Sequence, residues 1–163
     1  MKKLLKIVMM LLLAGLLFAC SSGSSDSSGG EVDDTKLFDP AECNFEIKGL
    51  RLSKGEWKYL EIIRDADYTY TVKYTFEMTS NSIGDAIYKS ITEIYEYSDG
   101  KQDKKEYTQD ELDAMDYTKS RVKKNWNWTY KTDKDQTKFY CSLKNQPDNE
   151  PFDGEIYLLK TSK

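Results

Sequence analysis

The side chains that could do chemistry in this chain are three cysteines and 28 carboxylates, because its 163 residues include no histidine. Without histidine there is no Ser-His-Asp or Cys-His catalysis and no His-ligated zinc site. Paired carboxylates could hydrolyse glycosides, but any acidic protein contains such pairs. The sequence shows no nucleophile elbow, phosphate-binding loop or Cys/His metal spacing. We therefore expect no enzymatic activity, no cofactor and no metal site.

The first of the cysteines, Cys20, ends a short apolar segment. Residues 1–6 contain three lysines and no acid, and residues 7–19 contain no charged residue. A membrane-spanning helix needs about 20 apolar residues, so this run is too short and is typical of an export signal instead. Its end, Leu17-Phe18-Ala19-Cys20, resembles the lipobox of bacterial lipoproteins. The resemblance implies that signal peptidase II cuts before Cys20 and that the Cys20 thiol carries a diacylglycerol.

The residues after Cys20 have the composition of a tether. Residues 21–30 read SSGSSDSSGG, which is a flexible coil with nothing to bury. We expect a signal peptide at 1–19, a lipidated linker at 20–40 and a single domain at 41–163. The lipid would hold this domain on the extracytoplasmic face of the cell membrane. A secreted protein with a free Cys20 is the alternative.

The charge balance limits the partners. The chain has a formal net charge of −4, and three of its 24 basic residues lie in the expected signal peptide. An acidic body repels the phosphate backbone, so we expect no nucleic-acid partner.

The expected domain has the pattern of a mainly β protein. Residues 68–78 alternate strictly, with Tyr70, Val72 and Phe76 on one face and threonines on the other, which predicts a half-buried antiparallel strand. The capping box Thr108–Glu111 predicts a short helix over 109–117. Residues 83–95 fit either a helix or a strand, and the second half favours a strand. Further strands are predicted at 44–52, 57–63, 91–97, 124–131, 138–143 and 155–159. We predict an antiparallel β-sandwich with one short helical insertion.

Three of these segments resemble a known family. They are Phe45-Glu-Ile-Lys-Gly-Leu-Arg-Leu-Ser, Tyr70-Thr-Val-Lys-Tyr-Thr-Phe-Glu-Met-Thr-Ser-Asn and Tyr97-Ser-Asp-Gly-Lys-Gln. Together they resemble the opening strands of telokin-like immunoglobulin domains, which commonly follow lipoprotein signals and Ser/Gly linkers in Gram-positive bacteria. The resemblance implies an immunoglobulin-like sandwich and, since the family mostly lacks an assigned activity, no particular reaction.

Cys43 and Cys141 remain as an even pair if Cys20 is lipidated. In an oxidising compartment such a pair predicts a disulfide that closes most of the domain. Two buried free thiols are the alternative.

The strongest candidate for a binding surface is the run Asn125-Trp-Asn-Trp-Thr-Tyr130. In a strand, Trp126, Trp128 and Tyr130 would share one face and could stack on sugar rings, while the asparagines bind hydroxyls. Burial of the three rings in the core is the interpretation we favour, because Trp and Tyr dominate core area at alternating positions, and the platform is the alternative. The neighbouring Lys119, Arg121, Lys123 and Lys124 could contact anionic lipid headgroups or simply be solvated. The acidic run 148–155 fits a plain turn better than a calcium loop.

These observations predict a lipid-anchored envelope protein whose domain binds a protein partner that the sequence does not identify. One alternative is a module that binds a glycan or a wall polymer. Another is an anchored inhibitor or immunity protein, whose acidic face would attract a basic partner.

Overall fold

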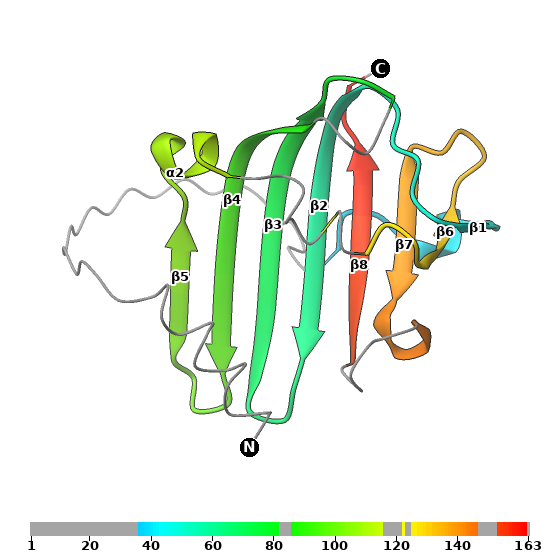
Figure 1. The fold of residues 1–163 in the computed structure, drawn as a ribbon. Coiled ribbons are helices and arrows are strands. Elements are labelled where there is room, and N and C mark those ends of the chain that lie inside the picture. Colours follow the sequence, from blue (N-terminus) through cyan, green and yellow to red (C-terminus); the bar gives the residue numbers. More distant parts are fainter. Residues whose placement is uncertain (1–35, 82–85, 116–121, 123–124, 147–152, 163) are drawn as a thin grey trace, which may run out of the picture. The chain divides into compact units, whose positions relative to one another are not determined.

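The structure is a computed structural model, which describes residues 36–81, 86–115, 122, 125–146 and 153–162 (Figure 1). The chain divides into residues 1–32 and 33–163, and the described elements all belong to the second unit. The predicted signal peptide, Cys20 and the Ser/Gly tether lie outside the described residues, as do the basic run 119–124, apart from Val122, and residues 148–152 of the acidic run. In the part that is described, no helix has the length and apolar character needed to cross a membrane.

The described domain is mainly β, as predicted. Its strands form one antiparallel sheet in the order β1-β6-β7-β8-β2-β3-β4-β5, seen face-on in Figure 1. Short helical turns precede β1 and follow β7, and the α-helix α2 follows β5. The elements are η1 (Pro40–Glu42), β1 (Phe45–Lys48), β2 (Gly55–Arg64), β3 (Tyr68–Met78), β4 (Ala86–Tyr97), β5 (Gln102–Glu106), α2 (Gln109–Asp113), β6 (Thr129–Thr132), β7 (Lys138–Ser142), η3 (Leu143–Asn145) and β8 (Asp153–Lys160).

The described strands do not divide into the two sheets of the predicted sandwich. β6 pairs with β7 through Lys131↔Tyr140 and Thr132↔Phe139, so β1 and β6 extend the same sheet instead of starting a second one. The apolar face of the sheet is covered by side chains from connecting segments and short helical elements. They are Leu50, Leu52, Leu112, Val122 and Leu143.

That face, the core face, is built on β3. The strand has the predicted bounds, and every second residue from Tyr70 to Met78 is buried. β2 contributes Trp57, which is fully buried and donates its indole N–H to the carbonyl of Ser53 at 2.9 Å. Large aromatic side chains such as these each remove much apolar area from water when they are buried.

The opposite face of the sheet, the back face, carries a second apolar cluster. Leu60 and Ile62 of β2 alternate with the core-face residues, so they point to the other side, where Tyr157 of β8 joins them. Phe38 packs edge-on against Tyr157, with 5.4 Å between ring centroids. The packed body therefore includes Leu37 and Phe38, which the sequence assigned to the linker.

Several local predictions differ in extent from the structure, and the strand expected at 44–52 covers only Phe45–Lys48. Residues 86–97 form strand β4, so the ambiguous segment is a strand wherever it is described. α2 begins at the predicted capping box but ends at Asp113, with Ala114 as its C-cap. The strand expected at 124–131 starts only at Thr129, because Trp128 N–H closes a turn on the carbonyl of Asn125 at 3.2 Å.

Candidate functional site

The three aromatic residues of the predicted platform lie in different environments. Trp126 is in the turn before β6 and is 47% exposed, Trp128 is half-buried against the core, and Tyr130 is 1% exposed. The Tyr130 hydroxyl donates to the carbonyl of Asn125 at 3.0 Å. The three rings therefore do not form the predicted row along one strand. Tyr130 belongs to the core, Trp128 is partly exposed, and Trp126 is the most exposed of the three rings.

Backbone hydrogen bonds hold the turn that presents Trp126. Leu50 N–H donates to the carbonyl of Trp126 at 2.6 Å, and Gly49 N–H donates to the carbonyl of Trp128 at 2.9 Å. Gly49 has a φ of +83°, a conformation that favours glycine. β1 therefore ends at Lys48, and the chain turns at Gly49 to meet this segment.

The predicted disulfide between Cys43 and Cys141 is not formed, and both cysteines are buried free thiols. Cys141 lies in the core-face cluster, whereas Cys43 belongs to the back-face cluster with Phe38 and Tyr157. The two thiols therefore belong to clusters on opposite faces of the sheet. Burial raises the pKa of Cys43 to about 11 and that of Cys141 to about 12. Both thiols are therefore protonated and unreactive at neutral pH.

One carboxyl group, that of Glu61, is buried on the core face, and sequence reasoning missed it. Glu61 is 2% exposed, and the hydroxyl of Tyr59 donates to its Oε2 at 2.7 Å. Burial raises the pKa of Tyr130 well above its usual value, and the nearby Cys141 and Glu61 add to the effect. The signal was present in the sequence, because Trp57, Tyr59, Glu61 and Ile63 follow one alternating pattern.

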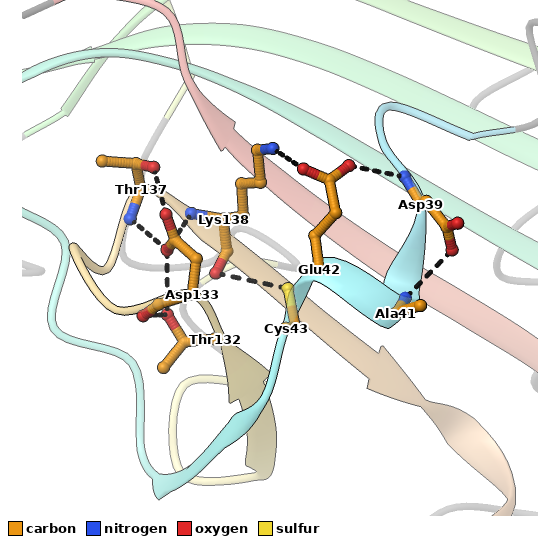
Figure 2. A network of polar contacts seen from close by, with 8 residues as sticks. All are labelled: Asp39, Ala41, Glu42, Cys43, Thr132, Asp133, Thr137 and Lys138. Atoms are coloured by element: carbon orange, nitrogen blue, oxygen red, sulfur yellow. Dashed lines mark hydrogen bonds and ion pairs between the residues drawn. The ribbon is translucent and has the colours of Figure 1, made fainter.

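The N-terminal end of the body is fastened to the sheet by a polar network (Figure 2). We call residues 36–43 the strap. Within it, Asp39 and Glu42 cap η1, and the Glu42 carboxylate pairs with the Lys138 ammonium of β7. The Cys43 thiol lies 3.8 Å from the carbonyl oxygen of Lys138. The strap is thus held by an ion pair and by the burial of Phe38.

A second part of this network fixes the turn between β6 and β7 (Figure 2). The Asp133 carboxylate accepts from the backbone N–H groups of Thr137 and Lys138 at 2.7 and 2.9 Å, and from the Thr137 hydroxyl at 2.6 Å. Burial opposes the charge, but these hydrogen bonds outweigh it and lower the pKa of Asp133. The carboxylate therefore serves the turn, which places Lys138 opposite Glu42.

Metal-binding geometry is not found in the described part of the chain, where no three His, Cys, Asp or Glu residues converge on one point. Comparison of the chain with protein-family models, with curated proteins and with solved structures finds no match.

Proposed function

We propose that this chain is a lipid-anchored protein of the cell envelope, held on the extracytoplasmic face of the membrane, whose β domain binds a partner and catalyses no reaction. The observation that carries the proposal is the order of three segments: the lipobox-like Leu17-Phe18-Ala19-Cys20, the run SSGSSDSSGG, and the strap that begins the packed body. Two or three acyl chains on one cysteine suffice for stable membrane attachment, since each buried CH₂ contributes about 0.8 kcal/mol.

The strap supports this proposal mechanically. A tether attached to a frayed end would unravel the domain from that end, whereas the strap enters the body through Phe38, Glu42 and Cys43. The anchor would therefore act on a segment with its own buried contacts.

The described side chains support a binding role over a catalytic one. The thiols of Cys43 and Cys141 are buried with raised pKa values, and the Asp133 carboxylate holds a turn. The resemblance to telokin-like immunoglobulin domains points the same way, although the described strands form one sheet. An immunoglobulin-like sandwich stays a prediction from sequence.

Metabolic labelling with an alkyne fatty acid tests the anchor. We expect the wild-type chain to be labelled and to fractionate with membranes, and Cys20→Ala to lose both properties. Cys43→Ala is the matched control, because its thiol lies inside the folded body and should leave labelling unchanged. An equally labelled Cys20→Ala chain would contradict the proposal.

A glycan-binding role is a second candidate, which the exposure of Trp126 favours. A single exposed indole in a turn can stack on a sugar ring, and its area would dominate such a contact. Trp126→Ala should abolish binding on a glycan array, while Ile87→Ala, which removes another exposed apolar side chain, should not. An array on which the wild-type chain binds nothing would remove this candidate.

A further inference from the structure

Two hairpin turns meet at the lower end of the sheet in Figure 1. One joins β2 to β3 through residues 65–67, and the other joins β4 to β5 through residues 98–101. Ser98 N–H donates to the carbonyl of Asp67 at 3.0 Å and ties the turns together. Within the second turn, Tyr97 N–H donates to the carbonyl of Lys101 at 2.9 Å, and the Asp99 carboxylate accepts from Lys101 N–H at 3.1 Å. The two turns thus form a fixed surface.

Between them lies an open hollow of about 460 Å³, which we call the end hollow. Its lining contains three carboxylates and one ammonium group, so the hollow carries net negative charge. The lining residues are Asp67, Tyr97, Ser98, Asp99, Lys101 and Asp103.

An aromatic wall stands beside these charges. Tyr97 is 39% exposed, and its ring lies nearly parallel to that of Tyr95, at 18° with 6.4 Å between centroids. Tyr95 in turn contacts Tyr70 at 4.5 Å and Tyr68 at 5.9 Å, so the exposed ring is backed by three others. The Tyr97 hydroxyl donates to Asp103 Oδ2 at 3.1 Å, which fixes the ring and leaves the phenol neutral. An ordered ring loses little conformational entropy when a ligand binds.

We propose that the end hollow binds a lysine or arginine side chain of a partner polypeptide. This inference rests on the proposed function as a binding domain and names the chemistry of the partner. A cation is attracted to the negative face of an aromatic ring and to nearby carboxylates, and the end hollow supplies both. The net charge of −4 would favour the approach of a basic partner.

The chain uses the same chemistry internally. Lys105 Nζ lies 4.1 Å from the centroid of the Tyr107 ring, on the segment that follows the end hollow. Inside the end hollow, Lys101 Nζ pairs with Asp99 Oδ2 at 2.6 Å, although four fifths of the lysine side chain is exposed. Lys101 therefore competes with an incoming cation, and its removal should strengthen binding.

A short fluorescein-labelled arginine peptide tests the proposal, with a glutamate peptide of equal length as the probe control. Fluorescence anisotropy is measured on the full chain in detergent micelles, at low and high salt. Tyr97→Leu should weaken binding of the arginine peptide by about two- to fivefold, the size of an exposed cation–π contact. Lys101→Gln should strengthen binding by up to about fivefold, and a misfolded variant could not mimic that gain.

A test variant and its matched control distinguish binding at the end hollow from attraction by the overall charge of the chain. Asp103→Asn changes the charge inside it, and Asp110→Asn makes the same change on α2, outside its lining. Asp103→Asn should weaken binding more than Asp110→Asn at both salt concentrations. Equal losses in the two, or unchanged binding in Tyr97→Leu, would overturn the proposal. Because peptide binding does not depend on acylation, an unlabelled chain that binds the peptide would contradict the anchor alone.

Discussion

The buried pair Tyr59–Glu61 should contribute more to stability than a similar pair at the surface. Tyr59→Phe removes the hydroxyl that donates to Glu61 Oε2 at 2.7 Å and leaves the ring in place. Tyr59 is 1% exposed and Glu61 is 2% exposed, so water cannot replace the lost donor. Removing one partner of a buried hydrogen-bonded pair costs about 1–3 kcal/mol. We expect Tyr59→Phe to lower the free energy of unfolding by about that amount and the Tm by roughly 4–12 °C.

Tyr140→Phe is the matched control for this experiment. The Tyr140 hydroxyl donates to Glu155 Oε1 at 3.0 Å, and the Glu155 side chain is 27% exposed and also pairs with Arg64. Water and the Arg64 guanidinium can donate to Glu155 in place of the lost hydroxyl. The expected loss of unfolding free energy is therefore only about 0.5–1 kcal/mol. Urea unfolding followed by tryptophan fluorescence measures both variants, with equal m values as the condition for comparing them.

The reasoning would be refuted if the two variants lost the same free energy, because burial would then not set the cost of the missing donor. A double-mutant cycle with Glu61→Leu, which removes the acceptor oxygens, isolates the pair itself. We expect a coupling free energy of about 1 kcal/mol or more between positions 59 and 61. A coupling near zero would mean that Tyr59 stabilises the core only through its ring.

Four further outcomes are expected. Alkylation and peptide mapping without reductant should find Cys43 and Cys141 both reactive in the urea-unfolded protein, whereas a bridged pair would not react. Phe38→Ala should speed alkylation of native Cys43 and leave Cys141 unchanged, since Phe38 and Cys43 share the back-face cluster. In urea unfolding, Gly154→Ala should lower the unfolding free energy by about 1–3 kcal/mol or more through overpacking, because the new Cβ would lie 2.4 Å from the carbonyl oxygen of Ile62. Gly100→Ala meets open space but a φ of +83°, so it should lower the unfolding free energy by about 1 kcal/mol. Burial raises the pKa of Cys141 from 9.0 to about 12. The protonated thiol therefore contributes fully to the unfolding free energy below pH 9, and this contribution is lost as the pH rises towards 12. The decline of unfolding free energy with pH should therefore be shallower in Cys141→Val.

The sequence predicted elements whose causes are local. Strict alternation from Tyr68 to Met78 gave β3 its bounds, because every second side chain meets the core. The capping box gave the start of α2, since Thr108 and Glu111 satisfy each other's backbone N–H groups within one turn. Neither result depends on residues far away in the chain.

The sequence could not predict which strands pair at the edge of the sheet. β6 and β7 are joined by only two register pairs in the described residues, and nothing in their alternation chooses one extended sheet over two packed sheets. The strand predicted at 124–131 was wrong before Thr129 for a similar reason. Its alternation is typical of a strand, but hydrogen bonds from Gly49 and Leu50, far earlier in the chain, hold residues 125–128 in a turn.

The need for a cover on the back face could have been predicted from β2, although the strap that provides it could not. Trp57 and Tyr59 point to the core face, so the apolar Leu60 and Ile62 must point to the back face and need a cover. Leu37 and Phe38 supply part of that cover, yet two apolar residues in an acidic stretch show no period and read as linker. The sequence of β2 indicates that Leu60 and Ile62 need a cover, but the sequence of residues 36–43 does not indicate that this segment provides it.

The two aromatic candidates for a binding surface differ in what lies behind the exposed ring. Trp126 stands in a turn and is the more exposed ring, but its predicted companions are half-buried or buried. Tyr97 continues a row of tyrosines and borders carboxylates that give the contact a preferred charge. A ring alone selects a ligand by shape, whereas a ring beside carboxylates selects it by shape and sign. For a chain with a net negative charge, the second kind of surface is the better match to a basic partner, and the opposite effects expected for Tyr97→Leu and Lys101→Gln distinguish it from the first.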